Sequence, residues 1–225
     1  MVSTKTIDSF LERIAKDDSK QSVANFRMSV PLMEGDYQFY KGINEWQHVY
    51  PAAEFGKDES DNLVFKKSNG LLMLHFINLT TEEEINALKK TASLLPMTFA
   101  AIKGADGRSL IVLVSIADEA GQVPQNEQDA EQLYLAGYES VKNLYLSQIP
   151  SDCKISLKAE KPTLKSCFML TQDASPYYNS KAVAMRIARN CQLSAAAPKR
   201  VDDLKAFQDN EFLYSKAVQE TQTEM

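Results

Sequence analysis

"GLLMLHFINL", Gly70 to Leu79, is the most informative stretch of the 225-residue sequence. Its length, its Leu, Ile and Phe content and its leading glycine are typical of a buried β-strand. His75, one of only two histidines in the chain, lies near its centre. A histidine in such a strand is a functional group, the occupant of a position where a more reactive side chain is expected, or an ordinary core histidine.

The composition is that of a globular protein that can bury one sizeable core, since 44% of the residues are hydrophobic. A net charge of −5 disfavours a general polyanion binder, although a local basic patch can still hold phosphate. The three cysteines (Cys153, Cys167 and Cys191) follow no zinc-ligand spacing, so we expect reduced thiols. We also expect a cytoplasmic protein without membrane contact, because neither a signal peptide nor a run of roughly 18 apolar residues is found. We expect no cofactor.

Four segments near this strand carry clear secondary-structure signals. Residues 6–15 place apolar side chains at helical spacing. Thr81 and Glu84 have the spacing of a capping box, which predicts a helix after the strand. Two apolar runs flank Gly104 and Gly107 and predict a β-hairpin, and an apolar stripe over 126–146 predicts a long helix.

The order of the elements indicates the fold class. We also expect strands near 153–158 and 166–171 and a helix that starts at about 178–182. Together these predict an α+β domain with a mixed or antiparallel sheet and helices packed on it, as in RNA-recognition-motif or ferredoxin-like folds. We place an N-terminal helix and lead-in at 1–35, the α+β domain at 36–195, and a C-terminal helix with a frayed tail at 196–225.

Four segments, in this order, resemble a known family. They are "YPAAEFG" (Tyr50–Gly56), "SNGLLMLHFINL" (Ser68–Leu79), "FAAIKGADGRSLIVLVSI" (Phe99–Ile116) and "LKSCFMLTQDASPYYN" (Leu164–Asn179). The chain resembles the VirE N-terminal-type domain of bacterial mobile-element proteins, which belongs with archaeo-eukaryotic-primase-like (primase-polymerase) domains. The resemblance implies a primase-polymerase core and a role beside mobile-element replication proteins, such as a helicase.

The chain departs from the metal-binding pattern that this resemblance implies. The resemblance implies a strand with two aspartates that are separated by one residue, so that they point to the same face about 7 Å apart. Such a pair can hold two divalent ions that clamp nucleotide phosphates. The corresponding residues here are His75 and Ile77. Isoleucine cannot bind a metal, and imidazole is a poor replacement for a carboxylate toward Mg²⁺.

At two other family positions, the chain has a different residue or keeps only the positive charge. The family's hairpin lysine corresponds to Ile111, and a later family arginine falls at or next to Lys165. Asp152 and Asp173 are candidates for a residual ion site or for turn and cap positions. The candidates for phosphate or nucleic-acid contact are Lys103, Arg108, Ser109, Lys165, Tyr177 and Tyr178.

Three functions are consistent with these residues. The first is a catalytically inactive primase-polymerase-like domain that binds nucleic acid through a local basic patch, or binds a replication or helicase protein. The second is an active metal-dependent enzyme with a rearranged site at His75. The third is a protein-interaction adaptor that uses amphipathic ends, Ile7–Ile14 and Val201–Val218. An unrelated α+β fold, in which His75 is an ordinary core histidine, is the alternative to all three.

Overall fold

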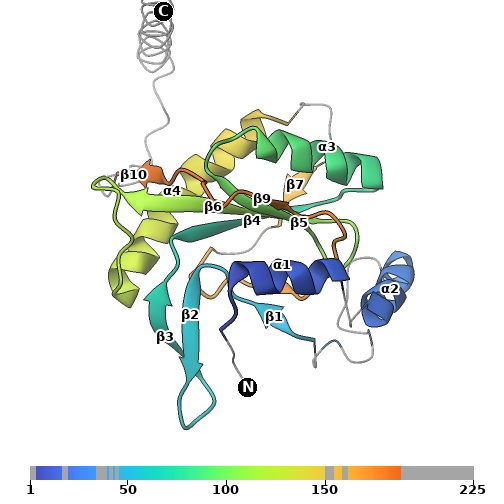
Figure 1. Ribbon diagram of the computed structural model, residues 1–225, viewed down its shortest axis with the longest axis horizontal. Coiled ribbons are helices and arrows are strands. Elements are labelled where there is room, and N and C mark those ends of the chain that lie inside the picture. The colour runs from blue at the N-terminus through green and yellow to red at the C-terminus, as the bar shows by residue number, and fades with distance from the viewer. Residues whose placement is uncertain are drawn as a thin grey trace, which may run out of the picture. The chain divides into compact units, whose positions relative to one another are not determined.

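The central sheet determines where the candidate residues lie (Figure 1). A computed structural model describes residues 4–16, 20–33, 40, 43, 46–149, 155–158 and 162–188, all within one compact unit, Met1–Cys191. In order across the sheet, its strands are β7 (Ser156–Leu157), β4 (Leu71–Ile77), β6 (Leu110–Asp118), β5 (Thr98–Lys103) and β9 (Tyr177–Tyr178). Neighbours in this order are antiparallel, and β10 (Met185–Ile187) pairs with β6 in parallel.

Two helices cover one face of this sheet. Helix α3 (Glu82–Ser93) connects β4 to β5, and α4 (Glu127–Ser147) lies between β6 and β7 in the chain. Buried residues of both helices build the main core together with Leu72, Leu74 and Phe76 of β4. The order of strands and helices is that of a split β-α-β domain.

Local signals explain where these elements begin and turn. The Thr81 hydroxyl accepts a hydrogen bond from the Glu84 amide, and the Glu84 carboxylate accepts one from the Thr81 amide, which completes the capping box of α3. Asn126 caps α4 by accepting from the Asp129 amide at 2.8 Å. Gly107 in the β5–β6 loop has a φ of 70°, which glycine adopts without steric cost.

The opposite face of the sheet is also covered. Helix α1 (Ile7–Lys16) and the strand pair β1 (His48–Val49) and β8 (Phe168–Met169) lie against it (Figure 1). The buried members of this second core are Ile14, Met73, Ala100, Ile102, Ile111, Leu113, Phe168 and Leu170. Because side chains alternate along a strand, His75 belongs to the face of Met73, away from α3 and α4.

Two further parts attach to these layers. Helix α2 (Lys20–Ser29) and the short 3₁₀ helix η1 (Val30–Leu32) pack on the β5–β6 loop, where Phe26, Val30 and Ala105 form a small core. The hairpin of β2 (Ala53–Lys57) and β3 (Leu63–Ser68) projects from the domain (Figure 1).

The structure confirms the α+β class, with a mainly antiparallel central sheet and four α-helices among the described residues. The helices expected over 6–15, after Thr81 and over 126–146 are confirmed, as is the hairpin at Gly104–Gly107. The helix expected from 178–182 is wrong, because β9 and β10 pair with β5 and β6 there. The proposed domain boundaries stay predictions, and the helix expected within 196–225 lies outside the described residues.

Within the described ranges, no helix combines the length and the apolar character needed to cross a membrane.

Candidate functional site

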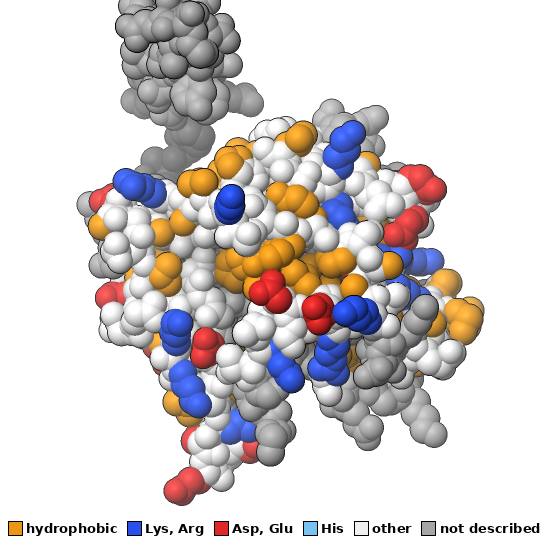
Figure 2. All heavy atoms as spheres, in the orientation of Figure 1, with side chains coloured by type: hydrophobic (Ala, Val, Ile, Leu, Met, Phe, Trp, Pro, Cys, Tyr) orange, Lys and Arg blue, Asp and Glu red, His pale blue; other side chains and the backbone are white. Residues whose placement is uncertain are grey.

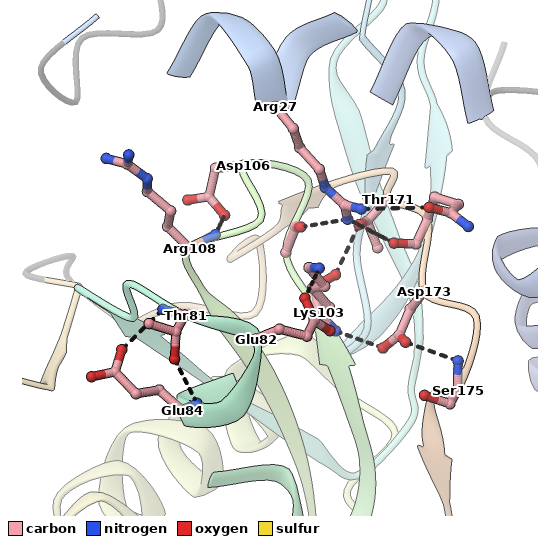
Figure 3. A network of polar contacts seen from close by, with 12 residues as sticks. Arg27, Thr81, Glu82, Glu84, Lys103, Asp106, Arg108, Thr171, Asp173 and Ser175 are labelled. Carbon is pink, nitrogen blue, oxygen red and sulfur yellow. Dashed lines mark hydrogen bonds and ion pairs between the residues drawn. The ribbon is translucent and has the colours of Figure 1, made fainter. Parts of the chain in front are cut away.

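Polar side chains converge at the loop that joins β5 to β6 (Figure 3). Three residues predicted as phosphate contacts or ion ligands belong to this loop network, namely Lys103, Ser109 and Asp173. The other members come from separate elements and are Arg27, Glu82, Lys89, Asp106, Thr171 and Ser175.

The loop itself is held by short-range hydrogen bonds. The Gly104 amide donates to the Ser109 carbonyl at 2.8 Å, and the Ser109 hydroxyl donates to the Asp106 carboxylate at 2.6 Å. A Cβ at Gly104 would lie 1.9 Å from the Ser109 Oγ, so no larger residue fits there without rearrangement. Ser109 is buried, and in this conformation its hydroxyl shapes the loop.

Arg27 of α2 fastens the loop from outside the sheet. Its Nε donates to the Ala105 carbonyl at 3.2 Å, and its Nη2 donates to the carbonyls of Gly104 at 3.1 Å and Gln172 at 2.7 Å. The same Nη2 lies 3.3 Å from the Thr171 hydroxyl, which donates to the Lys103 carbonyl at 2.8 Å. One guanidinium therefore joins the β5–β6 loop to the segment after β8.

Asp173 holds the other side of the network. Its carboxylate accepts hydrogen bonds from Lys89 Nζ at 2.9 Å, from the Lys103 amide at 2.8 Å and from the Ser175 amide at 3.0 Å. Lys89 and Asp173 form a buried ion pair, and these hydrogen bonds offset the cost of removing its charges from water. The hydrogen bond from the Ser175 amide, two residues later in the chain, is typical of an aspartate in a turn. A cation at Asp173 would have to displace these donors.

Lys103 and Arg108 present their charges differently. Lys103 Nζ forms an ion pair with Glu82 at the start of α3. The Arg108 amide donates to Asp106 at 3.0 Å, whereas Figure 3 shows its side chain directed away from the network. The Arg108 side chain is exposed, and its carbonyl accepts from the Leu79 amide at 3.1 Å, which places the loop beside the end of β4. Arg108 is thus the cation that this loop offers to solvent.

The positions that correspond to the metal motif lie in the sheet. His75 is half-buried and stands directly opposite Ile111, which is 1% exposed. Ile77 pairs with Ser156 of β7 and shares the face of His75 by strand alternation. This face continues into the second core through Met73 and Ile111.

Lys165 lies in a different setting. It is exposed in a turn in which the neighbouring Leu164 amide donates to Glu131 of α4 at 2.9 Å. This turn is tied to α4, whereas the loop network is tied to α2 and α3. Asp152 lies outside the described residues.

The two tyrosines of β9 are engaged in contacts within the domain. The Tyr177 hydroxyl donates to the Ser93 carbonyl at 3.4 Å, and the Tyr178 ring packs edge-on against Phe99 with centroids 5.3 Å apart. An open depression of about 330 Å³ beside them is lined by Asn86, Lys89, Lys90, Ser93, Ser175 and Tyr177. The described residues contain no group of three or more His, Cys, Asp or Glu side chains that could hold a metal ion.

Sequence reasoning missed Arg27 and Lys89. Arg27 bonds to Gln172, 145 positions away, and Lys89 bonds to Asp173, 84 positions away. One signal for Lys89 was available, because it belongs to the buried stripe of α3. A lysine on a core-facing helix position requires a carboxylate partner.

Comparison with models of protein families identifies the family of the chain. Residues 42–178, more than half of the chain, match the family model described as "BT4734-like, N-terminal domain". No curated protein and no solved structure matches the chain. The matched region runs from before β1 to the end of β9 and contains all of the loop network except Arg27. The chain belongs to the family of BT4734-like N-terminal domains.

Proposed function

We propose that this domain is a catalytically inactive, primase-polymerase-like module that binds nucleic acid and serves the replication of a mobile element. The split β-α-β order of the sheet supports the RNA-recognition-motif-like core of this proposal. The ordered resemblance of four segments supports its primase-like character, and they contribute β2, β4, the β5–β6 hairpin and β8–β9.

The inactive character rests on one observation: no carboxylate stands at the motif positions of this sheet face, where His75 and Ile77 are half-buried and Ile111 is buried. Ile111, opposite His75, belongs to the second core beneath α1 and β8. Phosphoryl transfer by a metal pair requires several oxygen ligands on one face. Isoleucine at 77 and 111 contributes none, and a single imidazole is better suited to transition metals than to Mg²⁺.

The binding character rests on Arg108 and the loop that presents it. Hydrogen bonds from Arg27 and to Asp106 fix the loop backbone, so little ordering is required when a ligand arrives. A guanidinium suits phosphate because its donors form a planar fork. Glu82 and Asp106 lie in the same network, so we expect weak binding that depends strongly on salt.

Fluorescence anisotropy with a labelled single-stranded oligonucleotide tests this proposal. One lost phosphate contact should reduce the slope of log affinity against log salt by about 0.7 for a single strand. We therefore expect that reduction in Arg108→Ala, with a loss of affinity at low salt. Lys181→Ala, which changes an exposed lysine outside the candidate set, is the matched control and should leave the slope unchanged.

Two results would contradict the nucleic-acid role. A slope that is identical in the wild type and Arg108→Ala would remove the loop from the binding surface. A wild-type chain that binds no oligonucleotide even at low salt would favour the protein-interaction function instead.

A further inference from the structure

An open depression beside the loop network has the size of a small-molecule site. Its volume is about 330 Å³, and such sites span about 300–1,000 Å³. The depression is formed by α3, β9 and the segment before β9. Its lining residues are Asn86, Lys89, Lys90, Ser93, Ser175 and Tyr177, of which Lys89 and Ser175 also belong to the loop network. It therefore has room for one compact group next to that network.

Internal hydrogen bonds hold part of this lining in place. Lys89 Nζ donates to both carboxylate oxygens of Asp173, at 3.2 and 2.9 Å, and to the Ser175 carbonyl at 3.0 Å. These three bonds use every donor of the ammonium group, so Lys89 has none left for a ligand. The Tyr177 hydroxyl donates to the Ser93 carbonyl at 3.4 Å. The lining is thus set before a ligand arrives, which lowers the ordering cost of binding.

Three other side chains of the lining are available to a ligand. Asn86, Lys90 and Ser175 are exposed, and none of these side chains forms a hydrogen bond or an ion pair within the part of the chain that the structure describes. All three groups can donate hydrogen bonds, and an ammonium can only donate. Because Asp173 offsets the charge of Lys89, the positive charge of Lys90 is the uncompensated one in the depression. These groups suit an anion such as a phosphate.

The ring of Tyr177 adds an aromatic surface to the depression. Tyr177 is half-buried, and it packs partly against the main core and partly lines the depression. An aromatic side chain of this kind can stack a nucleobase of any identity, provided that the base is unpaired. Sites for single-stranded nucleic acid combine such rings with positive charges that follow the backbone. Tyr177 and Lys90 provide one of each in the same depression.

The ion pairs of the loop network leave one free cation on either side of it. Lys89 and Lys103 are each paired with an acidic residue of the network. Lys90 and Arg108 form no ion pair with any residue that the structure describes. Figure 3 shows Arg108 at one side of the network and Ser175, which lines the depression, at the other. A strand that contacts Arg108 can therefore reach a second free cation by crossing the network.

We propose that the depression is a subsite for one unpaired nucleotide of the bound strand. The base stacks on the Tyr177 ring, a phosphate contacts Lys90, and Asn86 and Ser175 donate hydrogen bonds beside them. This inference rests on the proposed nucleic-acid role and specifies its ligand as a single strand. A duplex can contact Arg108 through its phosphates, but its paired bases are not free to stack on the ring.

The probe is a labelled oligothymidylate, and its duplex with oligoadenylate serves for comparison in the same anisotropy assay. We expect the wild type to bind the single strand more tightly than the duplex, although the duplex has the higher charge density. Lys90→Ala removes one phosphate contact and should lower the slope of log affinity against log salt by about 0.7. Lys67→Ala, which changes an exposed lysine of the β2–β3 hairpin, is the matched control and should leave the slope unchanged.

A pair of variants at Tyr177 separates stacking from a structural role of β9. Tyr177→Leu keeps an apolar side chain against the main core but removes the ring, so the affinity should fall at least about fivefold without a change of slope. Tyr177→Phe keeps the ring and should restore the affinity. An equal loss in both variants would overturn the stacking role. Lys90→Ala changes an exposed side chain, so it tests the subsite even if Tyr177→Leu does not fold.

The outcomes separate this subsite from the proposed function. Wild-type affinity and slope in both Lys90→Ala and Tyr177→Leu, together with a reduced slope in Arg108→Ala, would overturn the subsite and leave the nucleic-acid role standing. Losses in Lys90→Ala and Tyr177→Leu with an unchanged Arg108→Ala would support the subsite and remove the loop from the binding surface. A wild type that binds neither probe at low salt would overturn both.

Discussion

Replacing Asp173 by asparagine should destabilise the domain far more than a similar change at the surface. The Asp173 residue is 4% exposed, and its oxygens accept hydrogen bonds from Lys89, Lys103 and Ser175. Asparagine keeps the size of the side chain but removes its charge and turns one acceptor oxygen into a donor. The ammonium of Lys89, on a side chain that is 11% exposed, then stays in the interior without its carboxylate.

The expected magnitude follows from that uncompensated charge. Removing one partner of a buried ion pair typically costs about 3–5 kcal/mol. The Lys89 side chain retains slight solvent exposure, so we expect the lower end of the range, about 3 kcal/mol in the free energy of unfolding. For a domain of this size, that loss corresponds to a Tm lower by about 6–12 °C.

Urea unfolding followed by Trp46 fluorescence measures this loss. Trp46 is the only tryptophan, and its Nε1 donates to the Leu170 carbonyl at 2.7 Å, so its emission reports on the packing of the domain. Asp61→Asn is the matched control, because it removes the carboxylate of an ion pair with Lys57 at a side chain that is 78% exposed. We expect the control to cost at most about 1 kcal/mol. An Asp173→Asn chain that loses no more stability than this control would refute the reasoning.

Three further substitutions test other parts of the account. Thr81→Ala removes the side-chain cap of α3 and should cost about 1 kcal/mol in urea unfolding, while no loss would contradict the capping role. Gly107→Ala places a Cβ at a φ of 70° and 3.2 Å from the Arg27 Cδ, so a loss of about 1–2 kcal/mol is expected, and unchanged stability would show that the loop is not constrained there. Burial raises the pKa of Tyr134 to about 12, whereas an unfolded tyrosine ionises near 10, so the stability held below about pH 10 is lost as the pH rises toward 12. Tyr134→Phe should therefore weaken the fall of Tm between about pH 10 and 12, and an equal fall in both chains would contradict this assignment.

The parts of the fold that sequence reasoning predicts are those that nearby residues determine. The apolar run of β4 is long enough to specify a buried strand, and Thr81 and Glu84 specify the start of α3 within four residues. The glycines of the β5–β6 loop likewise allow a turn that larger residues resist. Each of these signals acts over a few positions, so it can be recognised without the rest of the structure.

The remainder depends on tertiary pairing that no local pattern encodes. The strands β9 and β10 have only two and three residues, and they form through pairing with β5 and β6. This pairing is not visible in the local sequence, and sequence reasoning therefore predicted a helix in their place. Helix α2 carries Arg27, which contributes to the site through acceptors more than 70 positions away. Of the candidate residues, Lys103, Ser109 and Asp173 meet in one network because the sheet brings the end of β5 to the segment after β8. Sequence reasoning identified these three residues as candidates, but it did not predict their hydrogen-bond partners.

Primer extension by the purified full-length chain tests most directly the claim that the face with His75 and Ile111 performs no catalysis. The assay supplies a labelled primer–template and nucleoside triphosphates with Mg²⁺ or Mn²⁺, and it compares the wild type with His75→Ala. We predict that neither chain extends the primer with either metal. Extension by the wild type that survives repurification and is lost in His75→Ala would contradict the claim and establish a working site at His75.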